Sequence, residues 1–236
     1  MIVSTDPDYL DTKLVKQGVK KLDPIFQELA DWINQKFDTP VLNIYYDKID
    51  VDKNRPRLSI IFEYNNDAIK FRDQVGNFDS NKQMMVAEKF KQILSRNTNT
   101  NNHLLARLFN KLKASKFDTE RLLIIFDEFE PVAREEVNAK IPQTEIDRLK
   151  QELASKNVWE IYREFATTTY FFYTDKQIEA YKTDGTTQIM TQQYFGILKK
   201  YDEFDYIKSD TSFLAFDSKE TFDKNFESNW FWYSRR

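Results

Sequence analysis

Glycine is scarce in this chain of 236 residues: it contains four, and no two of them (Gly18, Gly76, Gly185 and Gly196) lie closer than eleven residues. A phosphate-binding loop needs several neighbouring glycines, because its backbone must approach the ligand closely and adopt positive φ angles. The Rossmann fingerprint, the Walker A loop and the kinase glycine-rich loop are therefore missing from the sequence. The usual nucleotide-binding enzymes are excluded.

The chain also has no cysteine and a single histidine, His103. Disulfides, thiol nucleophiles, iron–sulfur clusters and zinc–thiolate sites are thereby excluded, as is a metal site with several histidines. We interpret His103 as an exposed residue at the start of a helix, because no Gly-x-Ser-x-Gly elbow accompanies it. We expect no cofactor.

The charges nearly balance, with 35 basic and 38 acidic residues and a net charge of −3. A protein that binds nucleic acid through its phosphates needs an excess of Lys and Arg, so we expect no nucleic-acid partner. The longest strongly apolar run, Leu122 to Phe126, is far shorter than the ~20 residues of a membrane helix. Since the first residues do not resemble a signal peptide either, we expect a cytoplasmic protein that does not bind membranes.

Strand-like and helix-like apolar segments alternate along the chain. Residues 41–51 and 57–64 are rich in Ile, Val and Tyr and are separated by the turn signal at 53–56, which predicts an antiparallel hairpin. Helical periodicity runs through 7–37, where Leu10 and Leu14 share one apolar face, and through later segments. These patterns predict an α+β fold of antiparallel sheets with helices packed on one side.

The composition changes in the last third of the chain. Residues 159–236 contain 21 of the 36 aromatic residues, together with 13 acidic and 10 basic residues. This shift predicts a helix-rich α+β lobe over 1–140 and an aromatic-rich α+β lobe over 141–236, with a single continuous domain as the alternative. A strand–turn–helix pattern recurs at 59–71, 122–137 and 212–226. Two related lobes would explain that recurrence, and so would chance.

The most suggestive motif is the strand-like run 122–126 followed by Asp127 and Glu128. It resembles the Walker B motif of P-loop NTPases, in which the Asp holds Mg²⁺ and the Glu polarises water. Because the phosphate loop is missing, we interpret the run as a buried strand that meets a solvated turn. The alternative is a metal-dependent hydrolase that uses Asp127 and Glu128, with Glu63 and Asp217 as further candidate ligands at strand ends.

The segment 229–233 reads Asn-Trp-Phe-Trp-Tyr and is predicted to be a strand with Trp230 and Trp232 on one face. If that face is open, the tryptophans form a protein-binding patch; if it is buried, they belong to the core. The sequence therefore favours a non-enzymatic protein-binding module, of the bacterial immunity or regulatory type. Its acidic last third suits a partner with a basic surface. The oligomeric state stays open.

Overall fold

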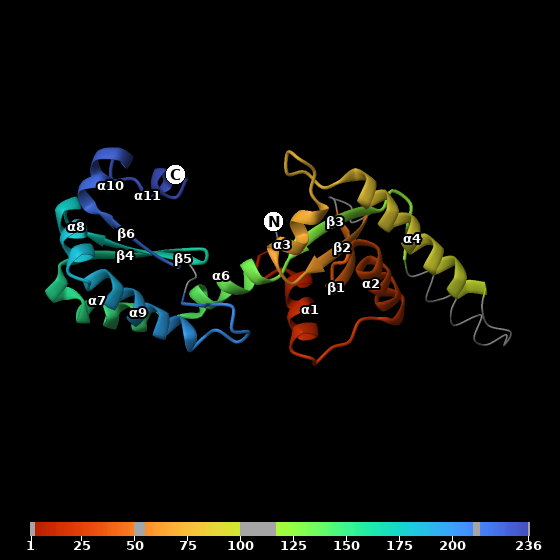
Figure 1. The fold of residues 1–236 in the computed structure, drawn as a ribbon, viewed down its shortest axis with the longest axis horizontal. Coiled ribbons are helices and arrows are strands. Elements are labelled where there is room, and N and C mark those ends of the chain that lie inside the picture. The colour runs from red at the N-terminus through yellow and green to blue at the C-terminus, as the bar shows by residue number, and fades with distance from the viewer. Residues whose placement is uncertain (1–2, 50–54, 100–116, 210–212, 236) are drawn as a thin grey trace. The chain divides into compact units, whose positions relative to one another are not determined.

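The computed structural model describes residues 3–49, 55–99, 117–209 and 213–235, so the region around His103 lies outside the described residues. Contacts divide the chain into two units, unit 1 over residues 1–131 and unit 2 over residues 132–236. The division into a helix-rich lobe over 1–140 and an aromatic-rich lobe over 141–236 stays a prediction. The described helices and strands confirm the α+β class (Figure 1).

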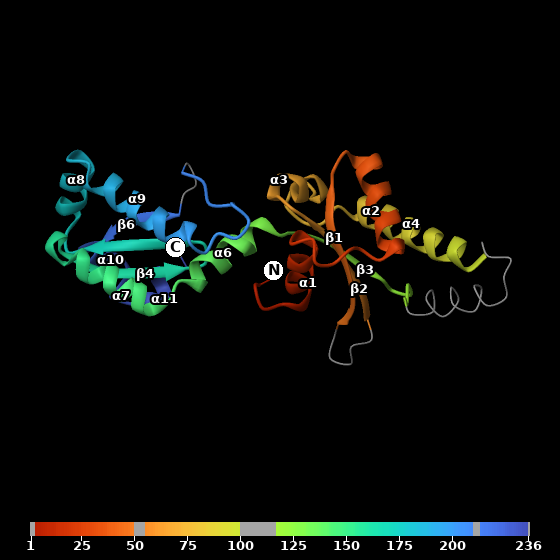
Figure 2. The same ribbon diagram turned by 90° about the horizontal axis from the view of Figure 1, so that it is seen from below.

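Unit 1 contains one three-stranded sheet and the helices around it (Figures 1 and 2). Its elements are α1 (Pro7–Lys16), α2 (Pro24–Phe37), β1 (Val41–Ile49), β2 (Arg55–Phe62), α3 (Asn65–Ala68), η1 (Ile69–Phe71), α4 (Ser80–Asn99) and β3 (Leu123–Glu128).

Helix α6 (Glu130–Lys140) begins at the end of unit 1 and continues into unit 2. The further elements of unit 2 are α7 (Gln143–Glu152), η2 (Ala154–Lys156), β4 (Val158–Glu164), β5 (Thr167–Phe172), α8 (Asp175–Thr183), α9 (Thr186–Lys199), β6 (Leu214–Ser218), α10 (Lys219–Phe226) and α11 (Trp230–Tyr233).

The predicted hairpin is present, but the sheets are mixed rather than antiparallel throughout. Strands β1 and β2 are antiparallel, whereas β3 joins β2 in parallel. A parallel neighbour requires a crossover connection, which α3, η1 and α4 belong to here. In unit 2 the same arrangement recurs, with β4 antiparallel and β6 parallel to the middle strand β5.

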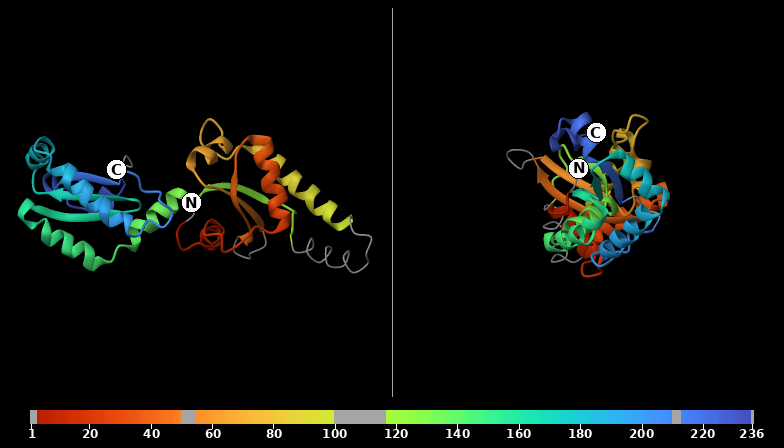
Figure 3. Two further views of the ribbon diagram at one scale, coloured as in Figure 1. Left: turned by 60° about the horizontal axis from the view of Figure 1, so that its bottom comes forward. Right: turned by 90° about the vertical axis from the view of Figure 1, so that its left-hand side faces the viewer.

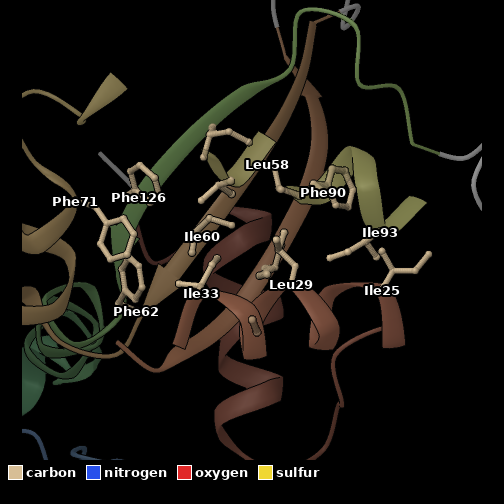
Figure 4. Packing of buried hydrophobic residues seen from close by; sticks show 14 of the residues in the cluster. Ile25, Leu29, Ile33, Leu58, Ile60, Phe62, Phe71, Phe90, Ile93 and Phe126 are labelled. Carbon is tan, nitrogen blue, oxygen red and sulfur yellow. The ribbon is translucent and has the colours of Figure 1, made fainter. Parts of the chain in front are cut away.

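Helices lie on both faces of each sheet rather than on one. In unit 1, α2 and α4 cover the face of Leu58, Ile60 and Phe62 (Figure 4), and α1 covers the opposite face (Figure 3, left). In unit 2, α7 and α9 lie below the sheet in Figure 1, and α10 and α11 lie above it. Each middle strand is buried over five consecutive residues, 58–62 in β2 and 168–172 in β5, as expected of a strand that is covered on both faces.

The two units share their strand order and strand directions. Both hairpins carry a register shift at the same place, between Val41 and Asn43 in β1 and between Val158 and Glu160 in β4. With the hairpins aligned on that shift, identical residues occupy equivalent strand positions: Ile44 and Ile161, Tyr45 and Tyr162, Phe62 and Phe172, Phe126 and Phe216, Asp127 and Asp217.

Helix α1 turns two polar side chains inward beside Tyr9, whose buried ring is stacked on Phe129. Asp8 is 2% exposed and Thr12 is fully buried, whereas Leu10 is 48% exposed. The helix is held by polar contacts, since the Asn43 amide donates to the Thr12 hydroxyl (3.0 Å) and to the Asp11 carboxylate (3.1 Å). Periodicity predicted Leu10 on the apolar face, but α1 packs through Asp8, Tyr9 and Thr12 instead.

We expect the aromatic cluster of unit 1 to dominate its stability. The buried Phe71 ring lies 4.7 Å from the rings of Phe62 and Phe126 (centroid to centroid). Phe71→Ala should lower the free energy of unfolding by about 3–5 kcal/mol, because the change leaves a cavity in a packed core. Val75→Ala, at a side chain that is 81% exposed, should change it by less than about 0.5 kcal/mol. Urea melts measure both, and equal effects would contradict the packing.

Candidate functional site

A layer of charged side chains lies between α1 and the sheet of unit 1. At its centre, the Arg57 guanidinium on β2 forms two hydrogen bonds with the Asp47 carboxylate on β1, at 2.8 and 2.7 Å. The Asp8 carboxylate of α1 lies 3.7 Å from the same guanidinium. The hydrogen bonds that Arg57 donates to Asp47 raise the pKa of the guanidinium, so Arg57 is charged. The layer therefore joins α1 to both strands of the hairpin.

Asp127 belongs to the same face of the sheet. It pairs in register with Ile61, and its neighbour Phe126 points into the opposite, apolar face. The Oδ2 atom of Asp127 is buried and has no hydrogen-bond partner among the described residues. Burial is the main cause that raises the pKa of this carboxyl from 3.8 to about 6, and the nearby Glu128 and Asp8 carboxylates add to it. Burial also raises the pKa of Asp8.

The four predicted metal ligands do not form one cluster. Glu63 is paired with Lys16 at 2.6 Å. Glu128 follows Asp127 in β3 and so points to the opposite face of the sheet. Asp217 belongs to the sheet of unit 2. Within the part of the chain that the structure describes, no three Asp, Glu or His side chains form a group that could hold a metal ion.

Asp217 occupies the position in unit 2 that Asp127 occupies in unit 1, but its surroundings differ. The Tyr233 hydroxyl donates to the Asp217 carboxylate at 2.8 Å. Asp127 has no such donor at its buried Oδ2. Both units thus carry a carboxylate at this position, and a described side chain donates to the buried oxygen of only one of them.

The segment that contains Trp230 and Trp232 is a helical turn, α11, so the prediction of a strand is wrong. The Asn229 side chain caps this turn by accepting from the Phe231 N–H at 2.9 Å. Helical geometry turns successive side chains by 100°, so the two tryptophans do not share a face. Trp230 packs inward, where its ring is stacked on Tyr162 at 4.6 Å and 11°.

The other two aromatic rings of the turn face solvent. Phe231 is 50% exposed and Trp232 is 53% exposed, and their ring centroids lie 5.0 Å apart. The Arg235 guanidinium lies 3.9 Å from the centroid of the Phe231 ring, in cation–π geometry. We call Phe231 and Trp232 the exposed aromatic pair. They are held in place because Trp230 and the buried Tyr233 anchor the same turn.

Sequence reasoning missed the Asp8, Asp47 and Arg57 layer. The sequence signalled an ion pair on the hairpin but with another acid, because the turn predicted at 53–56 places Asp52 opposite Arg57, whereas in the structure Asp47 pairs with Arg57. Opposite charges that face each other across a hairpin stabilise it. No sequence signal indicated that Asp8 would lie beside Arg57, because that contact depends on where α1 packs.

Comparison of the chain with family models, with curated proteins and with solved structures gives no match in any of the three. None of the helices in the described ranges is long and apolar enough to cross a membrane.

The raised pKa of Asp127 predicts a stability that depends on pH. Because the native pKa of about 6 exceeds the unfolded value of 3.8, the native state binds the proton more tightly. The stabilising contribution is complete below about pH 4 and is lost as the pH rises through 6. Asp127→Asn should therefore raise the free energy of unfolding at neutral pH, by at most about 3 kcal/mol, and flatten its dependence on pH.

Asp217→Asn is the matched control, because Tyr233 donates to the equivalent carboxylate in unit 2. This variant should gain no stability at neutral pH. Urea melts across the range from about pH 4 to 8 compare the two variants with the parent protein. An Asp127→Asn protein that is less stable than the parent at neutral pH would contradict the assignment of a destabilising buried charge.

Proposed function

We propose that the chain is a non-enzymatic protein-binding module that contacts its partner through the exposed aromatic pair. The observation that supports this most is that the four aromatic rings of α11 face two ways. Trp230 and Tyr233 pack inward, and Phe231 and Trp232 point to solvent. Large aromatic side chains and Arg are the residue types that contribute most to binding energy at protein interfaces. A turn that is already anchored loses little further conformational entropy on binding.

The charge of the partner belongs to the same proposal. Residues 159–236 carry 13 acidic and 10 basic residues, which favours a partner with a basic surface. Arg235 beside Phe231 adds one cation at the aromatic pair itself. We further propose a cytoplasmic location, because a chain without cysteine suits a reducing compartment. The proposed role is of the bacterial immunity or regulatory type.

Substitutions within α11 separate binding from stability. Trp232→Ala should change the free energy of unfolding by less than about 0.5 kcal/mol, because its side chain is half exposed. It should weaken the partner complex at least ~30-fold, which corresponds to about 2 kcal/mol. Trp230→Ala should instead destabilise the fold by about 3–5 kcal/mol, since Trp230 packs on Tyr162 and Phe222.

The measurements are urea melts of both variants and affinity capture from the native host at low and high salt. Proteins captured by the parent chain are then purified and titrated against the Trp232→Ala variant. Binding should weaken as the salt concentration rises, because exposed charge pairs are screened over ~8–10 Å. Equal affinity of the parent and of Trp232→Ala for every captured protein would refute the proposed role of the aromatic pair.

The alternative function is a carboxylate-dependent or metal-dependent hydrolase that uses Asp127 and Glu128. The observation that favours it is the Asp127 carboxyl, whose pKa is raised to about 6 and whose Oδ2 has no hydrogen-bond partner. A carboxyl with a pKa in this range can exchange a proton near neutral pH, as a general acid or base must. Its place in the layer beneath α1 and the inward Asp8 weigh against substrate access.

Calorimetric titration of Mg²⁺, Mn²⁺ and Ca²⁺ tests this alternative. We expect no saturable binding tighter than about 100 µM, because Asp127 and Glu128 point to opposite faces of the sheet and cannot hold one ion together. Saturable binding that disappears in the Asp127→Asn/Glu128→Gln double variant would instead establish a metal site and favour the hydrolase.

A further inference from the structure

A pocket of about 400 Å³ lies in unit 1, and this volume is within the range of small-molecule sites. Its lining residues come from α1, α2, β1 and the segments that precede α2 and β3. Two of them, Asn43 and Ile44, are buried, and the others are partly or fully exposed. A ligand that enters the pocket therefore meets side chains from several elements.

Part of the pocket is lined by apolar side chains that are only partly buried. They pack against the core of unit 1, and we call them the apolar wall: Leu22, Phe26, Tyr46 and Phe117. The centroid of the Phe117 ring lies 5.3 Å from that of Phe26 and 5.1 Å from that of Tyr46. Partly exposed aromatic rings in a concave surface favour a ligand with an apolar ring, because binding removes apolar surface of both from water.

Other contacts hold the apolar wall in place. The Tyr46 hydroxyl donates to the Asp118 carbonyl at 3.1 Å and accepts from the Asp118 N–H at 2.9 Å. These two bonds fix the neighbouring Phe117 beside β1. The Phe26 ring lies 6.1 Å from the ring of the buried Phe90 on α4 (centroid to centroid). Because the wall is already ordered, a ligand that binds to it loses little affinity to the ordering of side chains.

Four charged side chains line the same pocket, and three of them are engaged by neighbouring groups. Lys20 is paired with Asp11. The Asp23 carboxylate caps α2 by accepting from the Ile25 N–H at 3.1 Å. Lys21 is exposed and forms no ion pair with the described residues. The pocket therefore combines an apolar wall with one cation that has no counter-ion in the described part of the chain.

We infer that this pocket binds a small aromatic anion, whose ring lies against the apolar wall and whose negative group pairs with Lys21. A neutral aromatic molecule leaves Lys21 without a counter-ion, and a cationic one is repelled by it. The Asp11 carboxylate does not oppose the anion strongly, because Lys20 neutralises it. The pocket belongs to unit 1 and the exposed aromatic pair to unit 2, so the inference goes beyond the proposed function.

The test uses the whole chain and three probes that share one ring system and differ in charge: 2-naphthoate, 2-naphthamide and 2-naphthylmethylammonium. Calorimetric titration at neutral pH measures the affinity of each probe. We expect one equivalent of 2-naphthoate to bind about fivefold more tightly than 2-naphthamide, which is the effect of one ion pair at a partly exposed site. The ammonium probe should bind more weakly than the amide, because Lys21 repels it.

Substitutions of Lys21 test the charge without disturbing the fold, because this side chain is exposed. Lys21→Glu should reverse the order of the three probes, so that the ammonium probe binds most tightly. Lys21→Arg should keep the order found with the parent chain. Lys176→Glu is the matched control, since Lys176 is an exposed residue of α8 in unit 2. It makes the same change in net charge and should leave each affinity within about twofold of the parent value.

Methyl NMR spectra locate the bound probe. The signals of Leu22 in the apolar wall should shift with 2-naphthoate, and those of Leu198, which is buried in unit 2, should not. Trp232→Ala should leave the affinity for 2-naphthoate unchanged. The inference is overturned by the absence of saturable 2-naphthoate binding below about 1 mM, by equal affinities for the three probes, by an unchanged order in Lys21→Glu, by unshifted Leu22 signals, or by lost binding in Trp232→Ala. None of these outcomes contradicts protein binding through Trp232.

Discussion

The middle strand of each three-stranded sheet is the constraint on which the rest of the structure depends. Five consecutive residues of β2, from Leu58 to Phe62, are buried, and five consecutive residues of β5 are buried likewise. A strand that is apolar on both sides must be covered on both faces, because exposing either face would leave apolar surface in water. This requirement brings α2 and α4 to one face of the first sheet and α1 to the other.

The two units cover the second face of their sheets with different side chains. In unit 2 the second face is closed by aromatic rings of α10 and α11, which pack on Phe171. In unit 1 the equivalent face is closed by α1 through the charged layer around Arg57. The aromatic closure satisfies Asp217 through Tyr233, whereas the polar closure leaves Asp127 buried beside Asp8 with its pKa raised. In unit 1 this face is therefore destabilised by the Asp127 charge, whereas in unit 2 it is stabilised by aromatic packing.

The proposed binding surface follows from how the sheet of unit 2 is closed. In unit 2, closure by α11 uses two of four consecutive aromatic rings, and the helical turn necessarily directs the other two to solvent. The exposed aromatic pair is therefore supported by a packed element, which is the arrangement that favours specific binding.

The sequence by itself determined the α+β class, the first hairpin and the apolar strand before Asp127, because these depend on local periodicity and turn chemistry. It also placed carboxylates at the ends of strands in both halves of the chain. The tertiary structure alone decided that β3 and β6 join in parallel, that α1 turns Asp8 inward and Leu10 outward, and that Trp230 and Trp232 separate. Each of these outcomes depends on which surface a segment meets, and residues distant in the sequence supply that surface.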